Sequence, residues 1–147
     1  TEKKKIKLTI IGEGPYMKKV KIFSKLNNFE IFKNFLNRKK LIPIFEKNDV
    51  FIFPSIFDGW GVAPLEAMAS SMSLILSKDV GMIEILKKNS NDIIDHTKEE
   101  LLKTIKNLIN NRDRIKKNGK INRNILMNSL SNTKNSSKHL LDILKKI

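Results

Sequence analysis

Two carboxylates flank a glycine-rich loop in the middle of this chain, Asp58 before it and Glu66 after it. Gly59 and Gly61 carry no side chain, so the backbone there can approach a ligand closely. The amides around Gly61 and Val62 begin a predicted helix and have no partner within it, which makes them an anion site. Carboxylates beside such a site accept hydrogen bonds from sugar or ribose hydroxyls. The pattern therefore predicts a phosphate-bearing ligand with hydroxyl groups; the alternative is that Asp58 and Glu66 are ordinary surface carboxylates.

The elements around the loop place it at the edge of a sheet. Val50–Phe53 is a continuous apolar run that ends at Pro54, a pattern typical of a strand buried on both faces of a parallel sheet. A helix is predicted from Gly61 to Ser70, and Leu74–Leu76 is the next buried strand. Ligands of open α/β sheets bind at the carboxyl ends of the strands, which is where this loop must lie. Trp60 in the loop is either a core residue or the wall of a ligand site.

Short apolar strands alternate with helical patterns along the rest of the chain. Thr97 and Glu100 form a capping box that opens an amphipathic helix. Alternation of this kind predicts an α/β fold with a doubly wound parallel sheet, a Rossmann-like architecture with C-terminal helices. The other predicted elements are strands at residues 6–11 and 29–32 and helices at residues 15–26, 38–48 and 81–86, with two more helices around residues 121–125 and 140–144.

Composition limits the function classes. The chain has 147 residues, a net charge of +14 and no cysteine, which excludes disulfides, thiolate metal sites and cysteine nucleophiles. No apolar run approaches the ~20 residues of a membrane span. The positive charge suggests a nucleic-acid or membrane-surface binder, but it lies on the flanks, whereas residues 50–86 carry Lys78 against four carboxylates. Lysine far outnumbers arginine, which indicates a coding bias, so we expect no nucleic-acid partner.

Four motifs in register resemble a known family. Asp58-Gly59-Trp60-Gly61 leading to Glu66-Ala67-Met68-Ala69 closely resembles the signature of the C-terminal domain of family-4 (group 1) retaining glycosyltransferases of the GT-B fold, an acidic residue, seven residues and then Glu. Gly12-Glu13-Gly14-Pro15 after a strand, Val50–Ser55 before the loop, and Gly81–Leu86 after the next strand match in order and spacing. The resemblance covers residues 6–110.

This resemblance implies a reaction and a role for each site residue. The reaction is transfer of a sugar from a nucleoside-diphosphate sugar to a glycan or lipid-linked acceptor, with retention of configuration. Asp58 would contact the transferred sugar near the reacting carbon, and Glu66 would bind the ribose hydroxyls. Gly59, Trp60, Gly61 and Val62 would hold the donor sugar and diphosphate. The chain has no Asp-x-Asp pair, so we expect no metal and no cofactor beyond the donor substrate.

The chain also departs from the family pattern. Asp58 replaces the commoner Glu, and Ser71 and Ser73 replace Gly and Pro. The family's diphosphate-binding Arg and Lys and its acceptor-binding domain would precede Thr1. We therefore expect residues 1–147 to be one nucleotide-sugar-binding domain, truncated at its N-terminus and inactive alone, from a protein that is cytoplasmic or peripheral at the cytoplasmic membrane.

Two alternative functions stay open from the sequence. The first is a noncatalytic nucleotide-binding or assembly module of the same fold, and the second is a basic binder of nucleic acid or anionic membrane. Glu13 and Glu84 are interpreted as structural, and His96 and His139 are assigned to the surface because no sequence neighbour suggests base catalysis.

Overall fold

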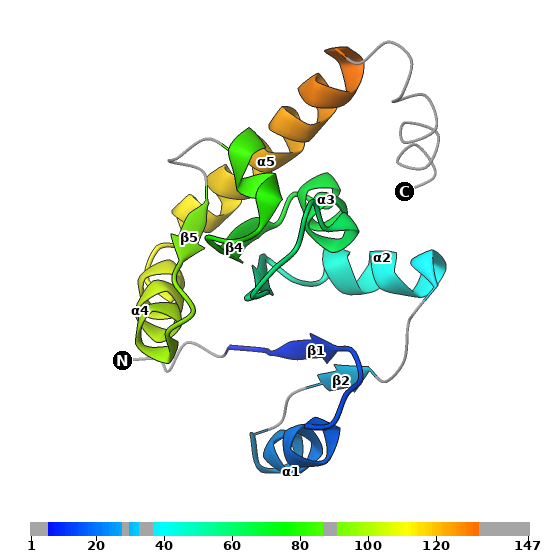
Figure 1. The fold of residues 1–147 in the computed structure, drawn as a ribbon, viewed down its shortest axis with the longest axis vertical. Helices are drawn as coiled ribbons and strands as arrows, with labels where there is room; N and C mark the ends of the chain where they lie inside the picture. Colours follow the sequence, from blue (N-terminus) through cyan, green and yellow to red (C-terminus); the bar gives the residue numbers. More distant parts are fainter. Residues whose placement is uncertain (1–5, 28–29, 33–36, 87–90, 133–147) are drawn as a thin grey trace. The chain divides into compact units, whose positions relative to one another are not determined.

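The computed structural model describes residues 6–27, 30–32, 37–86 and 91–132 (Figure 1). The chain divides into two compact units, Thr1–Pro43 and Ile44–Ile147, each of which is considered by itself. None of the described helices is both long and apolar enough to cross a lipid bilayer.

The first unit contains a two-stranded parallel sheet and a helix. Strands β1 (Thr9–Ile11) and β2 (Glu30–Phe32) pair with Ile10 opposite Ile31. Helix α1 (Met17–Asn27) connects them, as expected for two parallel strands that need a crossover. Helix α2 (Arg38–Glu46) then leads into the second unit.

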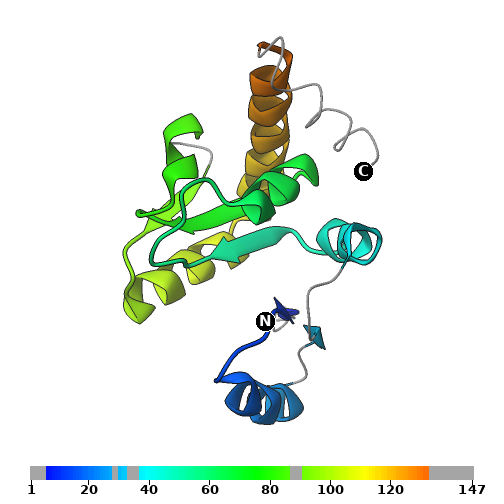
Figure 2. The ribbon, with the colours of Figure 1, turned by 45° about the vertical axis from the view of Figure 1, so that its right-hand side comes forward.

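The second unit is built on a three-stranded parallel sheet in the order β3-β4-β5 (Figure 2). Val50 pairs with Ser73, and Ile75 pairs with Asp92. The elements in chain order are β3 (Val50–Phe53), α3 (Val62–Ala69), β4 (Ser73–Ser77), the 3-10 helix η1 (Gly81–Ile85), β5 (Asp92–Ile94), α4 (Lys98–Ile109) and α5 (Arg112–Asn132).

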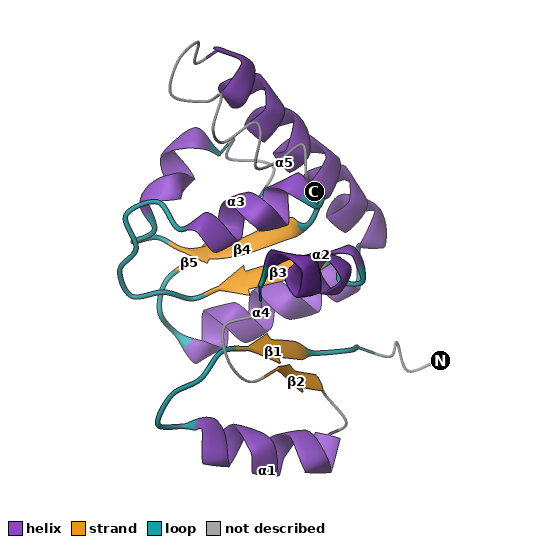
Figure 3. Cartoon of the chain, turned by 90° about the vertical axis from the view of Figure 1, so that its right-hand side faces the viewer, coloured by secondary structure: helices purple, strands orange, loops and turns teal. Residues whose placement is uncertain are grey.

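Helices cover both faces of this sheet, which confirms the predicted α/β class. Alternate residues of β4 point to opposite faces. Leu74 and Leu76 pack in one cluster with Met68 of α3 and Leu126 of α5. Ile75 packs in a second cluster with residues of β5 and α4. Figure 3 shows α3 and α4 on opposite sides of the strands.

Strand β4 is the centre of the core, whereas β3 is not. All five residues of β4 are buried. The prediction that Val50–Phe53 is buried on both faces is wrong, because all four residues of β3 are only half-buried. The reason is that β3 is the edge strand of its sheet, with a strand on one side only among the described residues.

Most predicted elements lie within a few residues of those observed, and three points differ. The sequence did not predict β5, a strand of only three residues. The Thr97 hydroxyl caps α4 by accepting from the Glu100 amide, as predicted, but the Glu100 carboxylate accepts from the amide of Asp95. The stretch around residues 121–125 belongs to the 21-residue helix α5. The helix predicted at residues 140–144 lies outside the described residues.

Candidate functional site

The loop that joins β3 to α3, residues Pro54–Gly61, is called the site loop here. It starts at the carboxyl end of β3, next to the carboxyl end of β4 and at the same edge of the sheet as that of β5, because all three strands run in parallel. This is the edge at which ligands bind in open α/β sheets. The structure therefore places the loop where the sequence predicts it.

Gly61 brings the carboxylate of Asp58 to the first turn of α3. Its φ of 52° lies in the left-handed region, which glycine adopts without strain. A Cβ on Gly61 would lie 3.2 Å from Oδ1 of Asp58 and 3.0 Å from Cδ of Pro64. The Asp58 carboxylate thus lies beside the position that a Cβ on Gly61 would take, close to the start of α3.

The first turn of α3 leaves amides available for an anion. Gly61 is the N-cap residue and provides no side-chain hydrogen bond to the helix. The N–H groups at the start of a helix have no intrahelical acceptor and lie at the positive end of its dipole. Pro64 has no N–H to satisfy, so the free donors of this turn are concentrated at Gly61, Val62 and Ala63.

The other predicted site residues lie along the same loop and helix. Glu66 is half-buried, one turn beyond Val62. Trp60 is 56% exposed, so its interpretation as a core residue is wrong. A Cβ on Gly59 would meet no atom within 4 Å, which means that the backbone there is open to an approaching ligand.

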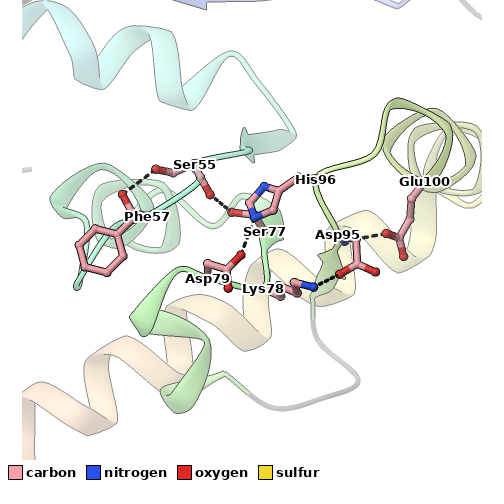
Figure 4. Close-up of polar contacts among 8 residues, drawn as sticks. All are labelled: Ser55, Phe57, Ser77, Lys78, Asp79, Asp95, His96 and Glu100. Atoms are coloured by element: carbon pink, nitrogen blue, oxygen red, sulfur yellow. Dashed lines mark hydrogen bonds and ion pairs between the residues drawn. The ribbon is translucent and has the colours of Figure 1, made fainter.

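The last residue of β4 and residues that follow the strand hold the site loop in place. The Ser77 hydroxyl donates a hydrogen bond to the carbonyl of Ser55, and the Ser55 hydroxyl donates to the carbonyl of Phe57 at 3.0 Å (Figure 4). The amide of Gly81 donates to the carbonyl of Asp58 at 2.9 Å. The residue pattern alone did not predict these contacts. The available signal was that parallel strands end at the same edge, so residues just after Leu74–Leu76 must neighbour the loop after Val50–Phe53.

Two polar side-chain pairs, one of them an ion pair, join the carboxyl ends of β4 and β5 (Figure 4). Nζ of Lys78 lies 2.7 Å from Oδ1 of Asp95. The hydrogen bond between them and their opposite charges lower the pKa of Asp95 and raise the pKa of Lys78. Nε2 of His96 lies 2.5 Å from Oδ2 of Asp79.

His96 is partly exposed, but it has a carboxylate partner 17 residues earlier in the chain, which sequence proximity could not reveal. His139 lies outside the described residues. Within the described part of the chain, no three His, Asp or Glu side chains gather in a group that could hold a metal ion.

Residues 1–124 match the family described as "Glycosyl transferases group 1". The chain belongs to this family. A relative, an uncharacterised glycosyltransferase (MJ1607) of Methanocaldococcus jannaschii, is 30% identical over 95 residues, which are 63% of this chain and 24% of the relative. The chain thus spans about a quarter of that relative's length.

Solved glycosyltransferase structures share the fold. The C-terminal domain of a group 1 glycosyltransferase (LpcC) from Francisella tularensis superimposes with a TM-score of 0.67 at 16% identity, covering 77% of this chain and 61% of that one. Anabaena HepE in complex with UDP gives a TM-score of 0.69 at 13% identity, covering 97% of this chain and 41% of that one. HepE has also been solved with UDP-glucose. At these identities the likeness shows the fold, an α/β Rossmann-like arrangement shared with group 1 glycosyltransferases.

Proposed function

We propose that this chain is the nucleotide-sugar-binding domain of a retaining glycosyltransferase of the family-4 type. The whole protein would transfer a sugar from a nucleoside diphosphate to a glycan or lipid-linked acceptor, as in polysaccharide biosynthesis. The observation that supports the proposal is the position of the Asp58 carboxylate: its Oδ1 lies 3.2 Å from the place that a Cβ on Gly61, the N-cap residue of α3, would take. A carboxylate and the amides of a helix start thus lie close together at the carboxyl edge of the sheet, the edge at which open α/β folds bind ligands.

Each part of the site has a chemical task in this proposal. The backbone of Gly59, Trp60, Gly61 and Val62 holds the donor sugar and diphosphate, and the amides of Gly61 and Val62 attract the diphosphate because they lie at a helix N-terminus. As the sugar–phosphate bond breaks, negative charge grows on the departing diphosphate, and the same fixed dipoles stabilise it. The carboxylate of Asp58 accepts hydrogen bonds from the transferred sugar. Glu66, one turn further along α3, accepts them from the ribose. We propose that this site works without a metal ion.

The rest of the reaction belongs to the longer protein. The chain spans 61% of the LpcC domain structure and 24% of the archaeal relative. We propose that residues 1–147 form one domain and that another part of the protein binds the acceptor and supplies cations for the diphosphate. The net charge of +14, carried by the flanks, supports a cytoplasmic protein that contacts an anionic membrane surface.

Nucleotide titration tests the donor site. UDP is the first probe because HepE was solved with it, and ADP and GDP test the choice of base. We expect weak but saturable binding, followed by calorimetry or by amide shifts in NMR spectra. Hydrogen bonds to a charged group contribute about 1.5–3 kcal/mol each, so Glu66→Ala should weaken UDP binding at least tenfold.

Glu84→Ala is the matched control, because Glu84 is an exposed carboxylate of η1 in the same acidic segment. It should change UDP affinity less than twofold. Unchanged affinity in Glu66→Ala would show that the ribose role is wrong. Failure of all three nucleotides to bind at millimolar concentration would refute the donor site itself.

A further inference from the structure

The backbone that continues β4 contacts the site loop at two places. We call residues Ser77–Gly81 the β4 extension. Its first residue donates a side-chain hydrogen bond to the carbonyl of Ser55, at the start of the loop. Its last residue donates its amide to the carbonyl of Asp58, and Val80 forms a parallel bridge with Asp58. The loop is therefore attached to the β4 extension on both sides of Ile56 and Phe57, by a side-chain hydroxyl at Ser55 and by main-chain contacts at Asp58.

The contact at Gly81 leaves no room for a side chain. A Cβ on Gly81 would overlap the carbonyl oxygen of Gly59 and lie 3.1 Å from the carbonyl carbon of Gly59. The φ of Gly81 is outside the left-handed region, so an alanine could adopt this backbone conformation. Glycine is therefore required at position 81 by the close approach of the loop, and any larger residue must displace Gly59.

The β4 extension is anchored more firmly than the loop it contacts. Val80 of the extension and Met82 directly after it are completely buried, whereas Ile56 and Phe57 are 79% and 85% exposed. On the side of β5, the amide of Lys78 donates to the carbonyl of Ile94 at 3.0 Å. A displacement forced at Gly81 will therefore move the exposed loop and not the buried extension.

We propose that Gly81 is a positioning residue for the donor site: it lets the β4 extension hold Asp58 and Gly59 at the distance from α3 that donor binding requires. This inference rests on the proposed function. Gly81 does not touch the donor in this proposal; it acts through the backbone of Asp58 and Gly59. Ser77 supports the same loop from its other end.

Gly81→Ala tests the proposal, and Gly119→Ala is its matched control. A Cβ on Gly119, in α5, would overlap the carbonyl oxygen of Ser71, outside the site loop, so both variants force a side chain into a backbone carbonyl. Both should lower the melting temperature. Gly81→Ala alone should shift the NMR amide signals of Gly59 and Gly61 and speed their hydrogen exchange in the absence of ligand. It should also weaken UDP binding at least tenfold, measured on the folded fraction.

The ligand-free readout separates this inference from the proposed function. If the unmodified chain binds no nucleotide, the proposed function fails, and the amide signals of Gly59 and Gly61 still decide whether Gly81 positions the loop. Unchanged signals in Gly81→Ala, or equal changes in Gly119→Ala, would overturn the inference. If Gly81→Ala does not fold, Ser77→Ala replaces it. That variant should shift the amides of Ser55–Asp58 and weaken UDP binding several-fold, and no change in either would overturn the inference.

Discussion

A buried pair of asparagines joins α5 to the start of β4, and we predict that Asn122→Ala destabilises the second unit by roughly 2–3 kcal/mol. Asn122 is completely inaccessible and Asn91 is 5% exposed. Their side-chain amides exchange two hydrogen bonds of 2.8 Å, and Nδ2 of Asn122 also donates to the carbonyl of Met72 at 2.8 Å. The variant loses these three bonds at about 1 kcal/mol each. The higher helix propensity of alanine offsets this loss of stability by roughly 0.5 kcal/mol.

Chemical denaturation followed by circular dichroism measures this effect. In a chain of this size, the loss corresponds to a decrease in melting temperature of roughly 4–12 °C. Asn124→Ala is the control, because Asn124 is exposed on the same helix, and it should change stability by less than about 0.5 kcal/mol.

A double-mutant cycle tests the pairing itself. Asn91→Ala and Asn122→Ala each remove the two shared bonds, whereas the double variant removes them only once. The double variant should therefore be more stable than the sum of the single effects predicts, by about 2 kcal/mol. Additive effects, or a loss below about 1 kcal/mol in Asn122→Ala, would refute the reasoning.

Three further predictions concern single positions. Ser71 has a φ of 59°, a left-handed conformation that costs an L-residue roughly 1–2 kcal/mol, so Ser71→Gly should raise stability by about 0.5–1 kcal/mol in urea denaturation after the greater chain entropy of glycine is subtracted. Thr97→Ala removes the N-cap hydrogen bond to the Glu100 amide and should lower stability by about 1 kcal/mol; an unchanged melting temperature would contradict the cap. The pKa of Asp95 is lowered by its hydrogen bond with Lys78, so its stabilising contribution is present above the unfolded pKa and is lost as the pH falls below about 4. The melting temperature of Asp95→Asn should therefore fall less between pH 5 and pH 2 than that of the unmodified chain. The pKa of Lys78 is raised, so its contribution is lost only as the pH rises above about 10.

Local patterns were sufficient to predict the elements that build the site. The apolar run Val50–Phe53 ending at Pro54 predicted a strand, and the following loop with Gly61 predicted a helix start. Both predictions depend on neighbours in the sequence, which is why they could be made without a structure. Strand β5 was missed because it has only two apolar residues, Ile93 and Ile94, between two aspartates, whereas the equally short β1 continues a longer apolar pattern.

The contacts that hold the site were outside the reach of the sequence. Gly81 hydrogen-bonds to Asp58, which lies 23 residues earlier in the sequence, and His96 hydrogen-bonds to Asp79, 17 residues earlier. The chain folds these segments together because β3, β4 and β5 are parallel and end at one edge of the sheet. The degree of burial was likewise decided by strand order, since similar apolar runs became a buried centre in β4 and a half-buried edge in β3.

The sequence alone therefore determined the type of site, two carboxylates and a glycine-rich helix start, because residue types and spacing are local properties. The tertiary structure decided which residues support that site. In the sequence Gly81 is only the first residue of a matching motif, and the reason for a glycine there appears when the strand order brings the Gly59 carbonyl into the space that a side chain at position 81 would fill.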